Sequence, residues 1–246
     1  MTTFLQAVAF LTVLPMPRRA GVAEAPAPWA AAWFPAVGAV LGGGLLGLDA
    51  LLGRFFPIPV TAAFVLLAWV GVTGALHLDG LMDSADALLS QRTPGERLRI
   101  LKDPAVGAFG VAAGCLALFL KIGALASLPG SSRVAILIAP MFGRWSALVT
   151  MAAFPYHRRP QGTTGGTLTA RLGVRQVAAG SILPLLVASV GGPPALLGLV
   201  VAVAMALAIG RFASRRLPAL TGDIYGCVIE LVEAVTLCLF SGSFVR

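Results

Sequence analysis

Long apolar stretches, separated by short polar segments, run from residue 29 almost to the end of the chain. A helix needs about 20 mostly apolar residues to cross the roughly 30 Å of hydrocarbon in a bilayer, and seven stretches approach or exceed that length. These predicted spans cover about residues 29–52, 58–78, 104–126, 134–154, 176–191, 194–212 and 224–243. The pattern therefore predicts an all-α fold, a polytopic membrane helix bundle with about seven transmembrane helices.

The first sixteen residues are also largely apolar, but Pro15 within them and Pro17 just after them interrupt the stretch before it reaches the length of a span. They predict an N-terminal interfacial or re-entrant helix. The segments between the spans are too short to hold a separate soluble domain. Residues 1–246 are therefore expected to form one integral membrane domain, which must contain any catalytic residues.

The loops differ sharply in positive charge. Thirteen Lys and Arg residues fall in segments on one side of the predicted membrane: Arg18, Arg19, Arg92, Arg97, Arg99, Lys102, Arg158, Arg159, Arg171, Arg175, Arg211, Arg215 and Arg216. The segments on the other side hold Arg54, Arg133 and Arg246. Because loops rich in Lys and Arg remain cytoplasmic, we predict a cytoplasmic N-terminus, an external C-terminus and a location in the inner or plasma membrane.

Composition agrees with this topology. Hydrophobic residues make up 58% of the chain and charged residues 11%, which is far from the usual mix of a soluble domain. The net charge of +8 does not indicate a nucleic-acid partner, because the basic residues are scattered among apolar spans and form no dense patch. The three cysteines show no CxxC spacing, so neither a zinc site nor a disulfide framework is predicted.

Three aspartates lie close together in HLDGLMDSADALLS, residues 77–90. On a helix, Asp79, Asp83 and Asp86 share one narrow stripe, because steps of four and three residues each come close to one turn. Carboxylates so close together repel one another unless a cation compensates them, and oxygen ligands of this kind suit Mg²⁺ or Mn²⁺. The alternative is a solvated helix end, capped by Asp79, with the other two side chains in water.

The last predicted span carries a second acidic stripe, Asp223, Glu230 and Glu233, within TGDIYGCVIELVEAV. An ionisable residue deep in hydrocarbon indicates function, unless it belongs to a structural ion pair. Arg144 is predicted at a depth similar to that of Glu233, so we expect it to face the bundle interior and to pair with Glu230 or Glu233. Lys121 lies near the outer end of its span and is expected to extend toward the interface.

Two polar segments on the predicted cytoplasmic side combine basic residues with Gly: RTPGERLRILKDPAVGAFG and PYHRRPQGTTGGTLTAR. Arginines and the N–H groups of helix N-termini suit diphosphates. Their Gly spacing matches neither a Walker A loop nor a Rossmann fingerprint, so solvated loops are the alternative. His77 is a candidate general base, yet on a continuous helix it points about 160° away from Asp79, and a helix-end histidine without a catalytic role is equally compatible.

Several segments resemble, in this order along the chain, the adenosylcobinamide-GDP ribazoletransferase family, also called cobalamin-5'-phosphate synthases. The segments are FLTVLPMP, HLDGLMDSADALLS, ERLRILKDPAVGAFGV, the GR of FGRW and TGDIYGCVIELVE. The blocks DGLMDSAD and TGDxxG together form a specific signature, and the resemblance covers nearly the whole chain. It departs at Pro104 and Ala105, where the family has a Ser-basic pair, and at Val13, where the family has Arg.

The resemblance implies an enzyme of late cobalamin assembly that joins α-ribazole, or its 5'-phosphate, to adenosylcobinamide-GDP and releases GMP. It also implies dependence on Mg²⁺, held by Asp79, Asp83 and Asp86, with Glu96, Asp103 and Asp223 as further ligands or orienting residues. The catalytic candidates are His77 and Asp83. The substrate-binding candidates, which rest on charge and predicted side of the membrane, are Glu96, Arg97, Lys102, Asp103, Arg144, Arg158, Arg159, Glu230 and Glu233.

Two other functions fit part of the pattern. A CDP-alcohol phosphotransferase of lipid synthesis also uses clustered aspartates at a membrane boundary, but its DGxxAR continuation is missing after Asp79 and Gly80. A secondary transporter would use Arg144, Glu230 and Glu233 as an intramembrane relay, although no inverted repeat is visible. The expected partners are the two substrates and the lipid bilayer, with a homo-oligomer or other cobalamin-assembly enzymes as further associations.

Overall fold

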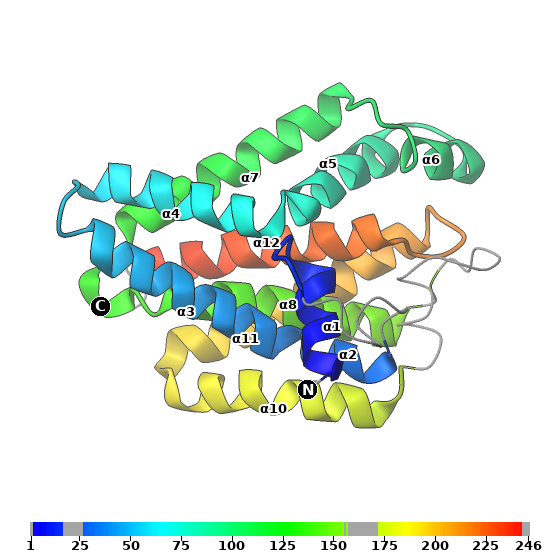
Figure 1. Ribbon diagram of the computed structural model, residues 1–246. Coiled ribbons are helices and arrows are strands. Elements are labelled where there is room, and N and C mark those ends of the chain that lie inside the picture. Colours follow the sequence, from blue (N-terminus) through cyan, green and yellow to red (C-terminus); the bar gives the residue numbers. More distant parts are fainter. Residues whose placement is uncertain (1, 17–26, 155, 157–171, 243–246) are drawn as a thin grey trace.

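The computed structural model describes residues 2–16, 27–154, 156 and 172–242. The helices in these ranges are α1 (Thr2–Leu11), α2 (Pro28–Ala32), α3 (Phe34–Leu52), α4 (Ile58–Thr73), α5 (Leu76–Leu89), α6 (Pro94–Ile100), α7 (Ala108–Ser127), η1 (Gly130–Ser132), α8 (Ala135–Ala153), α10 (Val174–Val190), α11 (Gly192–Ser214) and α12 (Gly222–Ser241). The described ranges contain no strand longer than an isolated bridge between Tyr156 and Leu220. Figure 1 shows the long helices lying side by side along the length of the molecule.

Five of the described helical segments are long and apolar enough to cross a membrane: α3, α7, α8 together with η1, α11 and α12. Helices α4 and α5 meet these conditions only as a pair, and they are bent by 84° at their junction. Helix α10, with 17 residues, is shorter. The chain is therefore a multi-pass membrane helix bundle, and its described ranges hold five segments long enough to span, or six if the bent pair counts as one. Each predicted stretch contains a helix, but the predicted number of seven spans is not confirmed.

The junction of α4 and α5 is the main departure from the prediction, which placed one span over residues 58–78. Gly74 and Ala75 both adopt left-handed backbone angles, with φ of 60° and 57°. The N–H of Gly74 donates to the carbonyl of Gly71 and that of Ala75 to the carbonyl of Val70, which closes the end of α4. The chain then sets off in a new direction as α5, so the HLDGLMDSAD segment does not continue α4 in a straight line.

The N-terminal segment forms the short helix α1, which at ten residues cannot cross a bilayer. It packs against α2 and α3. The ring of Phe10 stacks on Phe34 with centroids 5.6 Å apart, and the indole N–H of Trp33 donates to Thr3 Oγ1. The predicted span 29–52 is broken at Trp33, which lies between α2 and α3. The N-terminal segment is therefore a short helix docked on the bundle.

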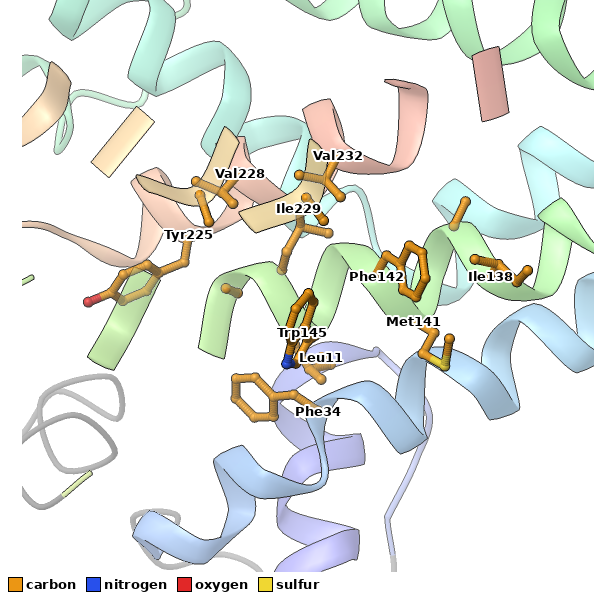
Figure 2. Packing of buried hydrophobic residues seen from close by; sticks show 14 of the residues in the cluster. Leu11, Phe34, Ile138, Met141, Phe142, Trp145, Tyr225, Val228, Ile229 and Val232 are labelled. Carbon is orange, nitrogen blue, oxygen red and sulfur yellow. The ribbon is translucent and has the colours of Figure 1, made fainter. Parts of the chain in front are cut away.

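Helix α8 lies at the centre of the bundle and packs against α3, α10, α11 and α12. Figure 2 shows Phe142 and Trp145 of α8 between the side chains of α12 on one side and those of α3 and α1 on the other. Close approach of α3 depends on Gly42, because a Cβ there would lie 2.6 Å from the carbonyl oxygen of Leu137. Most of the side chains of α8 are buried, which explains why this span contains a charged residue that never reaches the surface.

Candidate active site

Helix α5 carries the acidic stripe. It is continuous from Leu76 to Leu89, so Asp79, Asp83 and Asp86 lie on one face. Helix α5 is not among the five spanning segments. Partial burial and the neighbouring charges of Asp79, Asp223 and Asp86 raise the pKa of Asp83 from 3.8 to about 6. These carboxylates are therefore close enough to disfavour one another's negative charge, and this rim of the bundle favours a cation.

Asp86 has a structural partner that the sequence did not reveal. One carboxylate oxygen accepts the backbone N–H of Gly107 at 2.7 Å, and the other accepts that of Gly110 at 2.9 Å. These amides belong to the N-terminus of α7, where N–H groups lack partners within the helix and favour negative charge. Asp86 therefore ties α5 to the first turn of α7, with both of its oxygens engaged.

A cavity of about 200 Å³ lies at the start of α5, with lining side chains from α1, α3, α8 and α12. Asp79, His77 and Asp223 all line it. Helices α5 and α12 come close together at Gly80 and Gly226. A Cβ on Gly80 would lie 2.8 Å from the carbonyl oxygen of Asp223, so only glycine fits there. This close contact brings the two acidic motifs, far apart in the sequence, to a single cavity.

Aromatic rings form another part of the cavity wall. Tyr156 and Tyr225 stack with centroids 6.1 Å apart, and Phe10 and Phe34 line the cavity nearby. Figure 2 shows Tyr225 at the edge of the buried apolar cluster. Its hydroxyl is buried and has no hydrogen-bond partner within the described part of the chain. A buried phenol in this position can donate to a bound phosphate or ribose oxygen.

A network of charges lies deeper in the bundle. Lys121 Nζ of α7 contacts Glu230 at 2.5 Å and Glu233 at 2.6 Å, and Arg144 of α8 pairs with the other oxygen of Glu233. All four residues are at most 4% exposed. Lys121 also lies 4.8 Å above the ring of Trp69. The network therefore joins α7, α8 and α12 through two cations and two anions.

This network confirms the predicted pairing of Arg144 with Glu233 but shows that the prediction for Lys121 is wrong. Lys121 does not extend to the interface, because both glutamates face it from α12 and compensate its charge. Arg144, Glu230 and Glu233 were candidates for substrate binding. Arg144 pairs with Glu233 and Glu230 pairs with Lys121, and none of the three candidates lines the cavity that holds Asp79.

His77 connects this network with the cavity. Its Nδ1 lies 3.5 Å from Nη2 of Arg144. A guanidinium only donates, so a hydrogen bond between these two atoms requires Nδ1 to accept, and the proton of a neutral imidazole then resides on Nε2. The backbone of His77 packs beside Gly226, where an added Cβ would lie 3.2 Å from the Cα of His77. In this tautomer His77 offers a hydrogen-bond donor, which favours a role in binding over the predicted general base.

The four aspartates proposed as metal ligands do not form one ready-made site. Within the described residues, no group of three or more His, Cys, Asp and Glu side chains is arranged to hold a metal ion. Mg²⁺, however, is commonly bound through one or two carboxylates together with substrate phosphates. Asp79 and Asp223, which line one cavity, fit an ion of this kind. Asp86, whose oxygens accept two amides, fits it less well.

The remaining candidates lie in α6 and the loops beside it. Glu96 completes a capping box with Thr93, and these hydrogen bonds lower the pKa of its carboxyl. The guanidinium of Arg97 donates to the carbonyls of Leu88 and Arg92 at 2.8 Å. Asp103 accepts the backbone N–H of Ala105, and Lys102 is exposed. Arg158 and Arg159 lie outside the described residues.

The fold and the site together define an α-helical membrane protein in which acidic motifs from two helices meet at one cavity near the rim of the bundle. Residues 3–241 match the protein family described as cobalamin-5-phosphate synthase. The chain therefore belongs to this family.

Curated relatives agree with the family match over almost their whole length. A protein of Desulfitobacterium hafniense named adenosylcobinamide-GDP ribazoletransferase is 40% identical, over 94% of this chain and 93% of its own. Proteins with the same name from Brevibacillus brevis and Deinococcus radiodurans are 36% and 38% identical, covering 99% and 97% of this chain and 99% and 85% of their own. No solved structure matches the chain.

Proposed function

We propose that this chain is an adenosylcobinamide-GDP ribazoletransferase. It joins α-ribazole, or its 5'-phosphate, to adenosylcobinamide-GDP and releases GMP in the nucleotide-loop assembly step of cobalamin biosynthesis. Family membership and the names of the relatives support this function over a lipid phosphotransferase or a transporter. The structural observation that carries it is the shared cavity of Asp79 and Asp223, one residue from each acidic motif.

The reaction breaks the bond between the two phosphates of the GDP portion. A hydroxyl oxygen of α-ribazole attacks the phosphorus that carries the cobinamide, the hydroxyl proton is lost, and GMP leaves with the electrons of the broken bond. Negative charge then grows on oxygens beside Asp79 and Asp223, which would repel it. Asp79 and Asp223 would hold a Mg²⁺ ion, which would supply positive charge to offset this negative charge and stabilise the leaving phosphate.

Other side chains of the cavity contribute hydrogen bonds and exclude water. The Tyr225 hydroxyl and the His77 ring supply donors for phosphate or ribose oxygens. The rings of Phe10, Phe34 and Tyr156 provide apolar surface against which a planar base can lie. We propose that this site faces the cytoplasm, since the segments that follow α5 and precede α12 are among those rich in Lys and Arg.

The test measures GMP release by the purified protein given adenosylcobinamide-GDP, α-ribazole and Mg²⁺. Asp79→Asn and Asp223→Asn should each lower kcat by at least about 100-fold, because each removes charge from the cation site. Asp49→Asn makes the same chemical change at the opposite end of the bundle, where Asp49 pairs with Arg133. It should retain GMP release. No release from folded native protein would refute the proposed function, and full activity of both cavity variants would refute the site.

A further inference from the structure

A second and larger cavity, of about 480 Å³, lies between α5, α7, α11 and α12. Its walls are almost entirely apolar, with Leu81 and Leu88 of α5, Phe212 of α11 and Leu231 of α12 among them. At about 100° per residue, Leu81 and Leu88 lie roughly 180–200° around α5 from Asp79. The cavity is therefore separated from the acidic stripe by α5 itself, and a diphosphate bound at Asp79 does not reach into it.

Two guanidinium groups stand beside this apolar cavity. That of Arg216 lies over the ring of Phe212, with Cζ 3.7 Å from the ring centroid. That of Arg97 donates to the carbonyl of Leu88. Phe212 and Leu88 both belong to the cavity wall. Neither arginine forms an ion pair with a carboxylate in the described ranges, so both retain positive charge and donors for an anion.

We propose that this cavity binds one anionic phospholipid, with an acyl chain among the apolar side chains and the phosphate on Arg216 and Arg97. The wall from Leu81 to Leu88 is about 10 Å long, at roughly 1.5 Å per residue, which accommodates about half of an acyl chain. Leu89 and Phe212 are 54% and 38% exposed, so the cavity opens toward surroundings that a membrane protein shares with lipid. The proposal depends on membrane location and is independent of the proposed function.

The combination of an apolar cavity and two arginines favours a phospholipid over other ligands. An apolar segment of a second copy of the chain would fill the cavity without contacting the arginines. A free phosphate would use the arginines without filling the cavity. A phospholipid with an anionic headgroup uses both, because Arg near a membrane surface attracts anionic headgroups by about 1 kcal/mol per residue.

The experiment is native mass spectrometry of delipidated protein titrated with phosphatidylglycerol, with phosphatidylcholine of the same acyl chains, and with glycerol 3-phosphate. We expect one phosphatidylglycerol to bind at least about fivefold more tightly than phosphatidylcholine. Glycerol 3-phosphate should neither bind nor compete. Ala208→Trp and Ala113→Phe, which place bulk in the cavity from α11 and α7, should each abolish the tight site.

Charge is tested separately from shape. Arg216→Gln should weaken phosphatidylglycerol about fivefold and leave phosphatidylcholine unchanged. Arg175→Gln is the matched control, since Arg175 is exposed at the start of α10 and that helix does not line the cavity. Equal binding of the two lipids refutes the proposal. Three other results would also refute it. They are unchanged lipid binding by both bulky variants when these have native melting curves, a dimer that buries the cavity, and displacement of the lipid by α-ribazole.

Discussion

Lys121, Arg144, Glu230 and Glu233 show how a few buried charges can stabilise the packing of apolar helices. Removing all four from water costs free energy, which is recovered only if each charge has a partner. In this structure each cation contacts a carboxylate, and Glu233 joins both cations. Since apolar side chains can pack in many registers, such pairs also fix how α7, α8 and α12 align. We therefore assign these residues a structural role.

Lys121→Met should lower the free energy of unfolding by about 3–5 kcal/mol, because it leaves Glu230 buried without its cation. The measurement is thermal or denaturant unfolding in detergent. A double variant, Lys121→Met with Glu230→Gln, should recover part of the loss, since Glu233 keeps its pair with Arg144. Losses that simply add in the double variant would contradict the network.

His77 allows its inferred tautomer to be tested directly. The amide nitrogen of Gln occupies nearly the position of Nε2, whereas that of Asn lies closer to Nδ1. If His77 contributes an Nε2–H donor, His77→Gln should retain activity within about tenfold, and His77→Asn should lose about 100-fold. The pH profile of kcat for His77→Gln should match that of the native protein, because no proton transfer is lost. A profile that loses its acidic limb, the fall of kcat at low pH, would restore His77 as a general base.

At the scale of elements, α5 organises the site because its different faces make different contacts. One face presents the carboxylates, and Asp86 on that face also binds the N-terminus of α7. Another contacts α12 through Gly80, and the far face lines the larger apolar cavity. Because all these contacts belong to one short helix, a change in the angle between α4 and α5 would disturb the acidic cavity and the apolar cavity together.

The acidic stripe on α5 also predicts that the stability of the folded protein depends on pH. The pKa of Asp83 is raised from 3.8 to about 6 by burial and neighbouring carboxylates. Between these values the folded protein binds more protons than the unfolded one, so stability falls as pH rises through this window. Without divalent cations, Asp83→Asn should therefore melt at a higher temperature than the native protein at pH 7.5, with little difference at pH 4.

Mg²⁺ provides the second half of this test. At pH 7.5 the ion should raise the melting temperature of the native protein more than that of Asp83→Asn, because it compensates a charge that the variant lacks. Asp103→Asn, which changes an exposed carboxylate outside the stripe, should respond to Mg²⁺ as the native protein does. Identical responses of the native protein and Asp83→Asn would exclude Asp83 as a carboxylate whose charge the ion compensates.

At the scale of the whole molecule, hydropathy alone located the helices well, because long apolar runs have few alternatives to helix in a membrane. It missed the breaks at Trp33 and at Gly74–Ala75. The residues remain apolar at both breaks, so a hydropathy pattern carries no signal there. Gly74 was the one local clue, since glycine often ends a helix in the left-handed conformation.

The candidate site was predicted in part for a related reason. Charged residues are rare enough in this chain that Asp79 and Asp223 could be selected from the sequence, whereas their meeting at one cavity depends on the contact of Gly80 with α12. The sequence did not indicate Tyr225 as a site residue, because an aromatic residue in a span is usually part of the apolar core. Lys121 was misplaced because its depth was judged from its own span, while its partners belong to α12.

The 84° bend between α4 and α5 has a further consequence. It places the carboxylates of α5 at one end of the bundle, and the deeper charges of α7, α8 and α12 are closed off by their mutual pairing. In a protein built in this way, the proposed chemistry takes place at one end of the bundle. With the proposed function, substrates would arrive from, and products would return to, the same aqueous compartment, so turnover would neither need nor dissipate a gradient across the membrane.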